Sequence, residues 1–454
     1  MLRGARSALV DFRAMHAPHH SRLAMRSSLH AALVCALALV AWGSAPPAAA
    51  LFEAGAAKVE ITPPVGVPLN GYGARMGRSS TSVHDPLWAR TLYLSDGDTA
   101  LFLVTTDLCV INRALRERVL ALAPGIVPSE HILITASHSH NAHGGMVRGL
   151  AFRAVSGRFM PEVLDETARR IVGSMQAAYE ARTRAAIGWA TIEQETLSAN
   201  RSYENGAIDP QIGVLRVDDS DGNPLAIVAN FAAHPTTVPG ESRYALSADF
   251  PGFYYDELES LTPEGCVAMF TNGALGNQRC GAPDATSGWA RTEAIGRQLA
   301  RRVKEASNGI VPQEAALHVG YAQPALPPTL AEALQPDATV LATLEIDDLL
   351  MTFVPGEPVV EIGLRLRELA LARGYAAQFT VGCANDYLMY FVPRRYYSHF
   401  NYESGMNYFG PGVAEWLYRG FTELMQRGPA LPPPPTYDAP LPAEVPGALL
   451  VSVS

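Results

Sequence analysis

Short runs of β-branched and aromatic residues alternate with longer amphipathic stretches along most of this chain. Strand-like runs lie at residues 129–137, 226–233 and 266–271, and two more flank a turn and predict a hairpin over residues 90–111. Helical spacing of apolar residues appears in four ranges, 162–181, 291–306, 359–373 and 413–427. Because strands and helices are interspersed, we predict a mixed α+β (α/β) fold with a large mixed β-sheet core flanked by helices.

The two ends of the chain differ in composition from the part between them. Residues 26–50 contain Arg26, an apolar run and a closing alanine triplet, which is the pattern of a secretory signal peptide. We expect residues 1–50 to be a leader and signal peptide, cleaved after Ala50, and the mature chain to be secreted or periplasmic. The apolar run is too short for a membrane anchor, so we expect no transmembrane segment in the mature chain. From Pro429 the sequence becomes a stiff proline-rich tail, which leaves residues 51–428 for a single domain.

The charge of the mature chain bears on its binding partners, and its cysteine content bears on possible disulfides. The first 50 residues hold five arginines and one aspartate, so their removal changes the formal net charge from −9 to −13. An acidic protein gains nothing from the phosphate electrostatics on which nucleic-acid binding depends, and we expect no nucleic-acid partner. Four cysteines remain, an even number that permits one or two disulfides in an oxidising compartment.

One polar stretch, ASHSHNAHGG at residues 136–145, places three of the chain's twelve histidines within six positions. It follows an apolar strand-like run, so His138 and His140 should lie on one face if the extended conformation continues. Two imidazoles on one face suit a divalent metal ion, or one binds the metal while the other transfers protons. A polar loop with surface histidines is the alternative that this stretch alone leaves open.

Three further features supply potential partners for these histidines. His234 closes the apolar run ANFAA, although a lone histidine there is more often a satisfied core residue. Glu357 follows a Pro-Gly turn between an apolar strand and an amphipathic helix, where an isolated glutamate would complement the helix dipole. The stretch GCANDYLMYFVP predicts a strand that carries Asn385, Tyr387 and Tyr390, which are core positions by default.

Five motifs occur in the order and spacing of the neutral/alkaline non-lysosomal ceramidase family: TASHSHNAHGG, NFAAHPTTV, VPGEPVVEIGLRLRE, CANDYLMY and NYESGMNYFG. The opening GAAKVEITPPVGVPLNGYG also resembles the mature N-terminus of that family. The resemblance runs from about Gly55 to about Arg427 and so covers nearly the whole mature chain. It implies that residues 51–428 are a ceramidase-like zinc hydrolase catalytic domain.

The resemblance also implies a metal site and a catalytic set. Carried onto the matching positions, one zinc ion per chain would be held by four ligands, His138, His234, Glu357 and Tyr390. Nitrogen and oxygen ligands suit zinc, which lowers the pKa of bound water to about 7. Three positions match the family's catalytic residues: His140 for proton transfer, Arg201 for gripping the substrate oxygen, and Tyr402 for donating a hydrogen bond to the oxyanion.

The sequence departs from the family pattern at two places. The family's loop GDVSPN corresponds to GNQRCG here, so Asn277, Gln278, Arg279 and Cys280 replace its residues. That loop lines the substrate side of the pocket in the family, and an arginine there would favour an anionic head group over a neutral sphingoid diol. Characterised members also continue into an immunoglobulin-like domain, whereas only YDAPLPAEVPGALLVSVS follows the proline tract here.

These motifs together favour an exported zinc-dependent amidohydrolase that cleaves the N-acyl (amide) bond of a ceramide-like lipid. One alternative keeps the metal and changes the substrate, giving a zinc esterase or a hydrolase of another N-acylated amphiphile. A second alternative is a catalytically silent, zinc-stabilised binding protein. The presence of His140, Arg201 and Tyr402 favours an enzyme. The sequence does not indicate the head group, the acyl length or the oligomeric state.

Overall fold

The structure, a computed structural model, describes residues 51–150, 152–281, 287–329, 336–398 and 401–429. The predicted signal peptide at residues 1–50, and all of the predicted tail beyond residue 429, lie outside these ranges. Within them, no helix combines the length and the apolar character that crossing a membrane would require.

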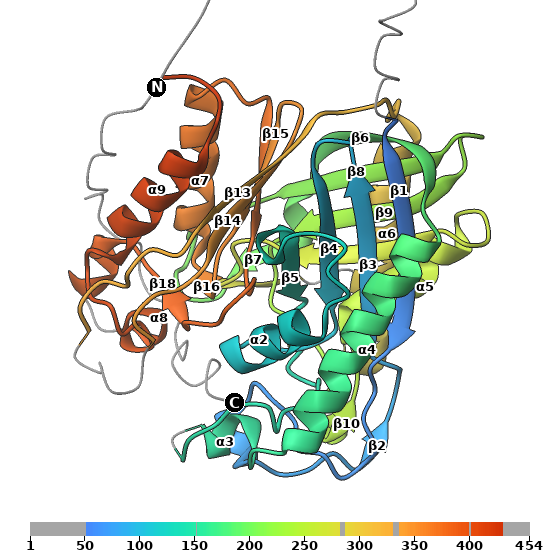
Figure 1. Ribbon diagram of the computed structural model, residues 1–454. Coiled ribbons are helices and arrows are strands. Elements are labelled where there is room, and N and C mark those ends of the chain that lie inside the picture. Colours follow the sequence, from blue (N-terminus) through green and yellow to red (C-terminus); the bar gives the residue numbers. More distant parts are fainter. Residues whose placement is uncertain (1–50, 151, 282–286, 330–335, 399–400, 430–454) are drawn as a thin grey trace, which may run out of the picture. The chain divides into compact units, whose positions relative to one another are not determined.

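The larger of two principal β-sheets has eight strands in the order β11-β9-β8-β6-β1-β3-β4-β5 (Figure 1). It is a mixed sheet, because β4 pairs with β5 and β9 with β11 in parallel, while the other neighbours are antiparallel. Its strands are β1 Glu53–Glu60, β3 Trp88–Ser95, β4 Ala100–Thr106, β5 Ile132–Ala136, β6 Thr183–Glu193, β8 Gln211–Asp219, β9 Pro224–Phe231 and β11 Val267–Asn272.

A second sheet has four strands in the order β13-β14-β15-β17. These strands are β13 Leu317–Ala322, β14 Leu341–Ile346, β15 Leu349–Phe353 and β17 Ala377–Val381. Three short two-stranded pairs complete the strands of the described residues: β2 Ser82–Val83 with β10 Ala245–Leu246, β7 Ser198–Asn200 with β12 Gln278–Cys280, and β16 Glu357–Pro358 with β18 Tyr390–Phe391.

Helices cover the outer face of each sheet (Figure 1). The α-helices are α2 Arg113–Leu122, α3 Arg153–Ser156, α4 Pro161–Glu180, α5 Phe250–Ser260, α6 Gly288–Asn308, α7 Val360–Ala372, α8 Tyr402–Gly405 and α9 Val413–Leu424. The 3-10 helices are η1 Gly73–Arg75, η2 Ser129–His131, η3 Glu195–Leu197, η4 Gly240–Ser242 and η6 Arg394–Ser398.

The main core lies between the two sheets, which pack face to face. Leu101 and Leu103 of β4 join this core with Phe353 of the second sheet. Phe102 and Val104, which alternate with them, belong to the core under α2 and α4. Because both faces of the strands are buried, they appear in the sequence as continuous apolar runs rather than as an alternating pattern.

The predicted mixed α+β fold is confirmed, and α4, α6, α7 and α9 lie at the four predicted helical ranges. The predicted hairpin over residues 90–111 is formed by β3 and β4. The strand predicted for GCANDYLMYFVP is wrong, because only Tyr390–Phe391 forms a strand there and Ala384 makes an isolated bridge. Cys383, Asn385 and Met389 have φ values of 50°, 63° and 65°, which a β-strand does not accommodate.

Candidate active site

His138 lies two residues beyond the end of β5. Its backbone has a φ of 72°, so the extended conformation expected through this stretch ends here. Its Nδ1 lies 2.7 Å from the carbonyl oxygen of Cys109. Because a carbonyl oxygen only accepts, Nδ1 carries the proton and Nε2 presents a lone pair. His138 is buried, and its Nε2 lies 3.3 Å from Oε1 of Glu357.

His234 follows β9 and presents its ring in the same way. Its Nδ1 lies 2.8 Å from the carbonyl oxygen of Leu275, and its Nε2 lies 3.0 Å from Oε2 of Glu357. The two histidine loops are joined by Asn272 at the end of β11, whose side-chain amide donates to the carbonyl oxygens of Ser137 and Ala233, both at 2.8 Å. One buried amide therefore fixes the backbone next to both histidines.

Glu357 and Tyr390 are brought together by the short parallel pair β16 and β18, in which they are register partners. The preceding Gly356 has a φ of 156°, and a Cβ there would lie 2.3 Å from the carbonyl oxygen of Met389. Only glycine permits this close approach of the two segments. Burial, followed by the Glu357 charge, holds the pKa of Tyr390 well above its ordinary value.

The chemistry of this cluster fits a cation. His138, His234 and Glu357 form a buried group whose ligand atoms all lie within 4.8 Å of one another. Burial lowers the pKa of His234 to about 4, so this imidazole is neutral. Burial opposes ionisation of Glu357, but its contacts with His138 and His234 hold its pKa well below the usual range. The carboxylate oxygens lie 3.3 and 3.0 Å from the Nε2 atoms of His138 and His234, and a bound metal ion would be held by this set of nitrogen and oxygen ligands.

His140 points its Nε2 at the same place, 3.1 Å from Nε2 of His138. Its Nδ1 is buried and has no hydrogen-bond partner within the described residues. Burial and the neighbouring His138 and His234 keep the pKa of His140 well below its ordinary value. Gly71, with a φ of 101°, admits this ring, because a Cβ at Gly71 would lie 2.5 Å from Cγ of His140. The half-buried His140 is therefore a neutral imidazole beside the metal group.

Arg201 makes contacts other than those expected for a residue that grips the substrate. Its Nη2 donates to the Tyr390 hydroxyl at 2.9 Å and to the Gly276 carbonyl oxygen at 2.7 Å, and its Nε lies 3.3 Å from Glu403. Arg201 does not line the cavity described below. Tyr402, at the start of α8, packs its ring against Tyr390 with centroids 5.5 Å apart. Burial raises the pKa of Tyr402 to about 12, so its hydroxyl remains a donor.

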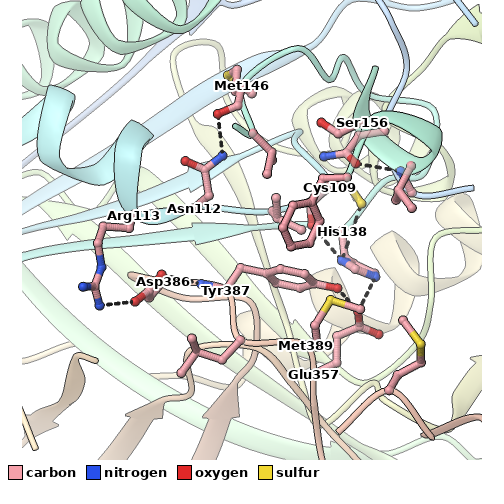
Figure 2. Close-up of a pocket in the computed structure, with 18 of the residues that line it drawn as sticks. Cys109, Asn112, Arg113, His138, Met146, Ser156, Glu357, Asp386, Tyr387 and Met389 are labelled. Atoms are coloured by element: carbon pink, nitrogen blue, oxygen red, sulfur yellow. Dashed lines mark hydrogen bonds and ion pairs between the residues drawn. The ribbon is translucent and has the colours of Figure 1, made fainter. Parts of the chain in front are cut away.

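Tyr387 also contacts the site, although its place in the sequence predicted a core residue. Figure 2 shows its ring reaching from the side of Asp386 toward His138 and Glu357. Its hydroxyl donates to Oε1 of Glu357 in a short hydrogen bond. The tyrosine follows the irregular backbone at Cys383 and Asn385, and no periodic signal in the sequence distinguishes it from a core residue.

The site opens into a cavity of about 560 Å³. His138, His140, Glu357, Tyr390 and Tyr402 line it together with many apolar side chains. Apolar lining residues include Val110, Met146, Val147, Phe152, Val155, Leu388, Met389 and Met406. An apolar cavity of this size with convergent polar groups at one place is typical of a site for a small amphiphilic ligand.

The departure from the family loop lies away from this cavity. None of Asn277, Gln278, Arg279 and Cys280 lines it, and Arg279 is exposed. The expectation that this arginine selects an anionic head group is therefore wrong, because strand β12 turns its side chain to solvent. Asn277 instead contributes to the local framework, since its amide donates to the Tyr396 hydroxyl at 2.7 Å.

The four cysteines and His143 are buried in the protein. The four cysteines of the described residues are free and buried, so the disulfides that their even number permitted are absent among them. Sγ atoms of Cys109 and Cys383 lie 3.9 and 3.4 Å from Nδ1 of His138. His143, the third histidine of the stretch, is fully buried, and its Nε2 lies 3.0 Å from Oγ1 of Thr167.

Comparison with known proteins identifies relatives of this chain. The family model for the N-terminal region of neutral/alkaline non-lysosomal ceramidases matches residues 52–278, which are half of the chain. The neutral ceramidase of Pseudomonas aeruginosa is 25% identical over 278 residues, 57% of this chain and 40% of that relative. Neutral ceramidase B of Dictyostelium discoideum is 25% identical over 177 residues, 35% of this chain and 24% of that relative. These matches thus span less than half the length of either relative.

A solved structure shares the fold over a larger part of the chain. The crystal structure of the Pseudomonas aeruginosa neutral ceramidase superimposes with a TM-score of 0.73 and 21% sequence identity. The superposition covers 84% of this chain and 76% of that one. The resemblance drawn from the five sequence motifs is confirmed. The chain belongs to the neutral/alkaline non-lysosomal ceramidase family.

Proposed function

We propose that residues 51–428 form the catalytic domain of an exported zinc-dependent amidohydrolase, which cleaves the N-acyl bond of a ceramide-like lipid. The observation that carries this proposal is the buried group of His138, His234 and Glu357 at the end of an apolar cavity. The names of the relatives, neutral ceramidases, supply the substrate class.

His138, His234, Glu357 and Tyr390 are the residues proposed to hold one zinc ion per chain. Zinc, when bound, polarises a carbonyl oxygen and lowers the pKa of water to about 7, so that water becomes a nucleophile at neutral pH. The protein's own part is to orient the ligands. The carbonyl oxygens of Cys109 and Leu275 fix the tautomer of the two histidines, which keeps both Nε2 lone pairs available.

His140 is proposed to move the proton during hydrolysis. Addition of water to the amide carbonyl carbon releases a proton, and cleavage of the C–N bond requires a proton on the leaving nitrogen. A neutral imidazole accepts the first and returns it to the nitrogen, so that a carboxylic acid and a free amine result. The position of His140 supports this role, because the residue lines the cavity and its Nε2 lies 3.1 Å from Nε2 of His138.

Tyr402 and Arg201 are proposed to act on the polar groups around the reacting carbonyl. The neutral hydroxyl of Tyr402 lines the cavity and would donate to the oxyanion that develops on the carbonyl oxygen. Arg201 contacts Tyr390 rather than the cavity, so we assign it the positioning of the Tyr390 hydroxyl. Glu403 holds Arg201 in turn.

Hydrolysis of fluorogenic N-acylsphingosine tests this function directly. The purified protein should cleave this amide, lose activity in a chelator and recover it when zinc is added back. Acyl ester and N-acyl amino acid probes in the same assay separate the alternatives, because faster cleavage of either would indicate an esterase or another N-acyl hydrolase. Zinc-loaded protein that cleaves none of the probes would be the silent binding protein instead.

We also predict that the mature chain begins at about Leu51, outside the cytoplasm. The Arg26 region, the apolar run and the alanine triplet support cleavage after Ala50. Mass spectrometry of the protein from its native source should find this N-terminus in the exported fraction. A cytosolic protein that retains residues 26–50 would contradict the prediction.

A further inference from the structure

A second cavity of about 300 Å³ lies beside the active site and is lined by three arginines, Arg75, Arg78 and Arg243. Tyr72, Met76 and Tyr244 also line it, and no aspartate or glutamate does. One water molecule occupies about 30 Å³ in the liquid, so the cavity has room for a group the size of phosphate. Three positive charges in one small cavity are unusual in a chain with a formal net charge of −9.

The charge of these arginines is not compensated by neighbouring acids. None of the three forms an ion pair with a carboxylate of the described residues. Arg78 donates to the Tyr244 hydroxyl at 3.2 Å, and Arg243 lies 5.1 Å from the centre of the same ring. The sequence contains no aspartate or glutamate between Glu60 and Asp85, the segment that supplies Arg75 and Arg78.

Arg75 supplies a buried positive charge in the wall of this cavity. Its side chain is 4% exposed, and its Nη atoms donate to the carbonyl oxygens of Asn70 and His140 and to Oδ1 of Asn141. Its Nε is buried and has no hydrogen-bond partner among the described residues. Burial lowers the pKa of Arg75 to about 10, and the charge of Arg243 also lowers it, yet the group stays charged at neutral pH. Arg75 therefore adds a buried positive charge to the cavity wall, while its Nη donors are bonded to the protein.

We propose that this second cavity is a binding site for a phosphate-type oxyanion, held by hydrogen bonds from Arg78 and Arg243 and by the positive charge of Arg75 in its wall. Guanidinium groups match such oxyanions because their planar donors form paired, charge-assisted hydrogen bonds. The site is separate from the proposed zinc ligands, although Arg75 links its wall to the backbone of His140. It stands independently of the proposed hydrolase function, because it rests on charge and geometry at another cavity.

Two sources share this chemistry: free inorganic phosphate and the head group of an anionic phospholipid. The surroundings favour the lipid. Met76, in the lining, is 73% exposed, and Leu150 is 78% exposed one turn before Arg153. The segments of these two residues adjoin, because the Gly77 amide donates to the carbonyl oxygen of Ala154 at 2.8 Å. Exposed apolar side chains beside a cationic cavity suit a surface that offers both acyl chains and phosphates.

Binding of inorganic phosphate to the whole protein, measured by calorimetry and by the rise in Tm at constant ionic strength, tests the site. The wild type should bind phosphate saturably. The double variant Arg78→Gln/Arg243→Gln should bind it at least about 100-fold more weakly, since each lost hydrogen bond to a charged group costs about tenfold or more. Arg75 is left unchanged because it supports the His140 backbone. The single variant Arg243→Gln, with an expected loss of about tenfold, serves if the double variant does not fold.

The double variant Arg301→Gln/Arg419→Gln is the matched control, because it removes two exposed positive charges from α6 and α9. It should bind phosphate like the wild type. Flotation with vesicles of phosphatidylcholine, alone or mixed with phosphatidylglycerol, separates the sources. Binding to the mixed vesicles that phosphate displaces indicates a lipid head group, whereas phosphate binding alone indicates the free ion; both support the site. A wild type that binds neither probe, or equal affinities in the wild type and Arg78→Gln/Arg243→Gln, would overturn it.

Discussion

Replacement of His234 by alanine should deprive the protein of nearly all its zinc and abolish hydrolysis. The Nε2 atom of His234 is 3.0 Å from Glu357, and its Nδ1 is held by backbone carbonyl oxygens, so Nε2 is the atom that it offers to the metal ion. Loss of an outer-shell partner typically costs 10–100-fold in metal affinity. Loss of a direct ligand should therefore cost more than about 100-fold. Elemental analysis of protein purified without added metal should give about one equivalent of zinc for the wild type and far less for the variant.

The matched control for this prediction is His143→Ala. His143 comes from the same histidine-rich stretch and is also fully buried, but it contacts Thr167 rather than the metal group. Its replacement should lower Tm, because a buried hydrogen bond is lost, while zinc content stays at about one equivalent. Full zinc occupancy in His234→Ala, or none in the wild type, would rule out the proposed ligand set.

The fold was largely predictable because its four longest helices carry a periodic signal and several of its strands appear as apolar runs. The helix α4, for example, repeats apolar residues at helical spacing over twenty residues. The helix α2 was not predicted, because its ten residues, RALRERVLAL, include four charged ones and bury only a few side chains. The face-to-face packing of two sheets was not predicted either. Strands that are buried on both faces carry no alternating pattern to indicate which layer covers them.

The site was predicted from sequence motifs rather than from periodic patterns. The positions of His138, His234, Glu357 and Tyr390 came from motif order. In the structure the two histidines follow β5 and β9 of the larger sheet, and Glu357 and Tyr390 are partners in the pair β16–β18. The reason given for His138 and His140 was wrong, because the left-handed backbone at His138, not a continued strand, places the rings together. Tyr387 was missed because its contact with Glu357 depends on irregular backbone between β17 and β18.

A second prediction with a large expected effect distinguishes His138 from His140. His138→Ala should lose both zinc and activity, together with the stability that bound metal confers. His140→Ala should keep its zinc and its fold, while kcat falls by about 10²- to 10⁴-fold, the usual contribution of a positioned general acid–base group. Zinc content, Tm and kcat measured on both variants check the prediction.

The structure supplies a physical reason for this division of roles. Nδ1 of His138 and of His234 each meets a carbonyl oxygen, which fixes the tautomer as in metal-ligating histidines, whereas Nδ1 of His140 is buried without a partner among the described residues. A ring whose Nδ1 has no hydrogen-bond partner has no fixed tautomer. It is therefore better suited to exchange protons than to hold a metal. Loss of zinc from His140→Ala with retention in His138→Ala would reverse the roles. Full activity in both variants would show that the histidine stretch takes no part in catalysis.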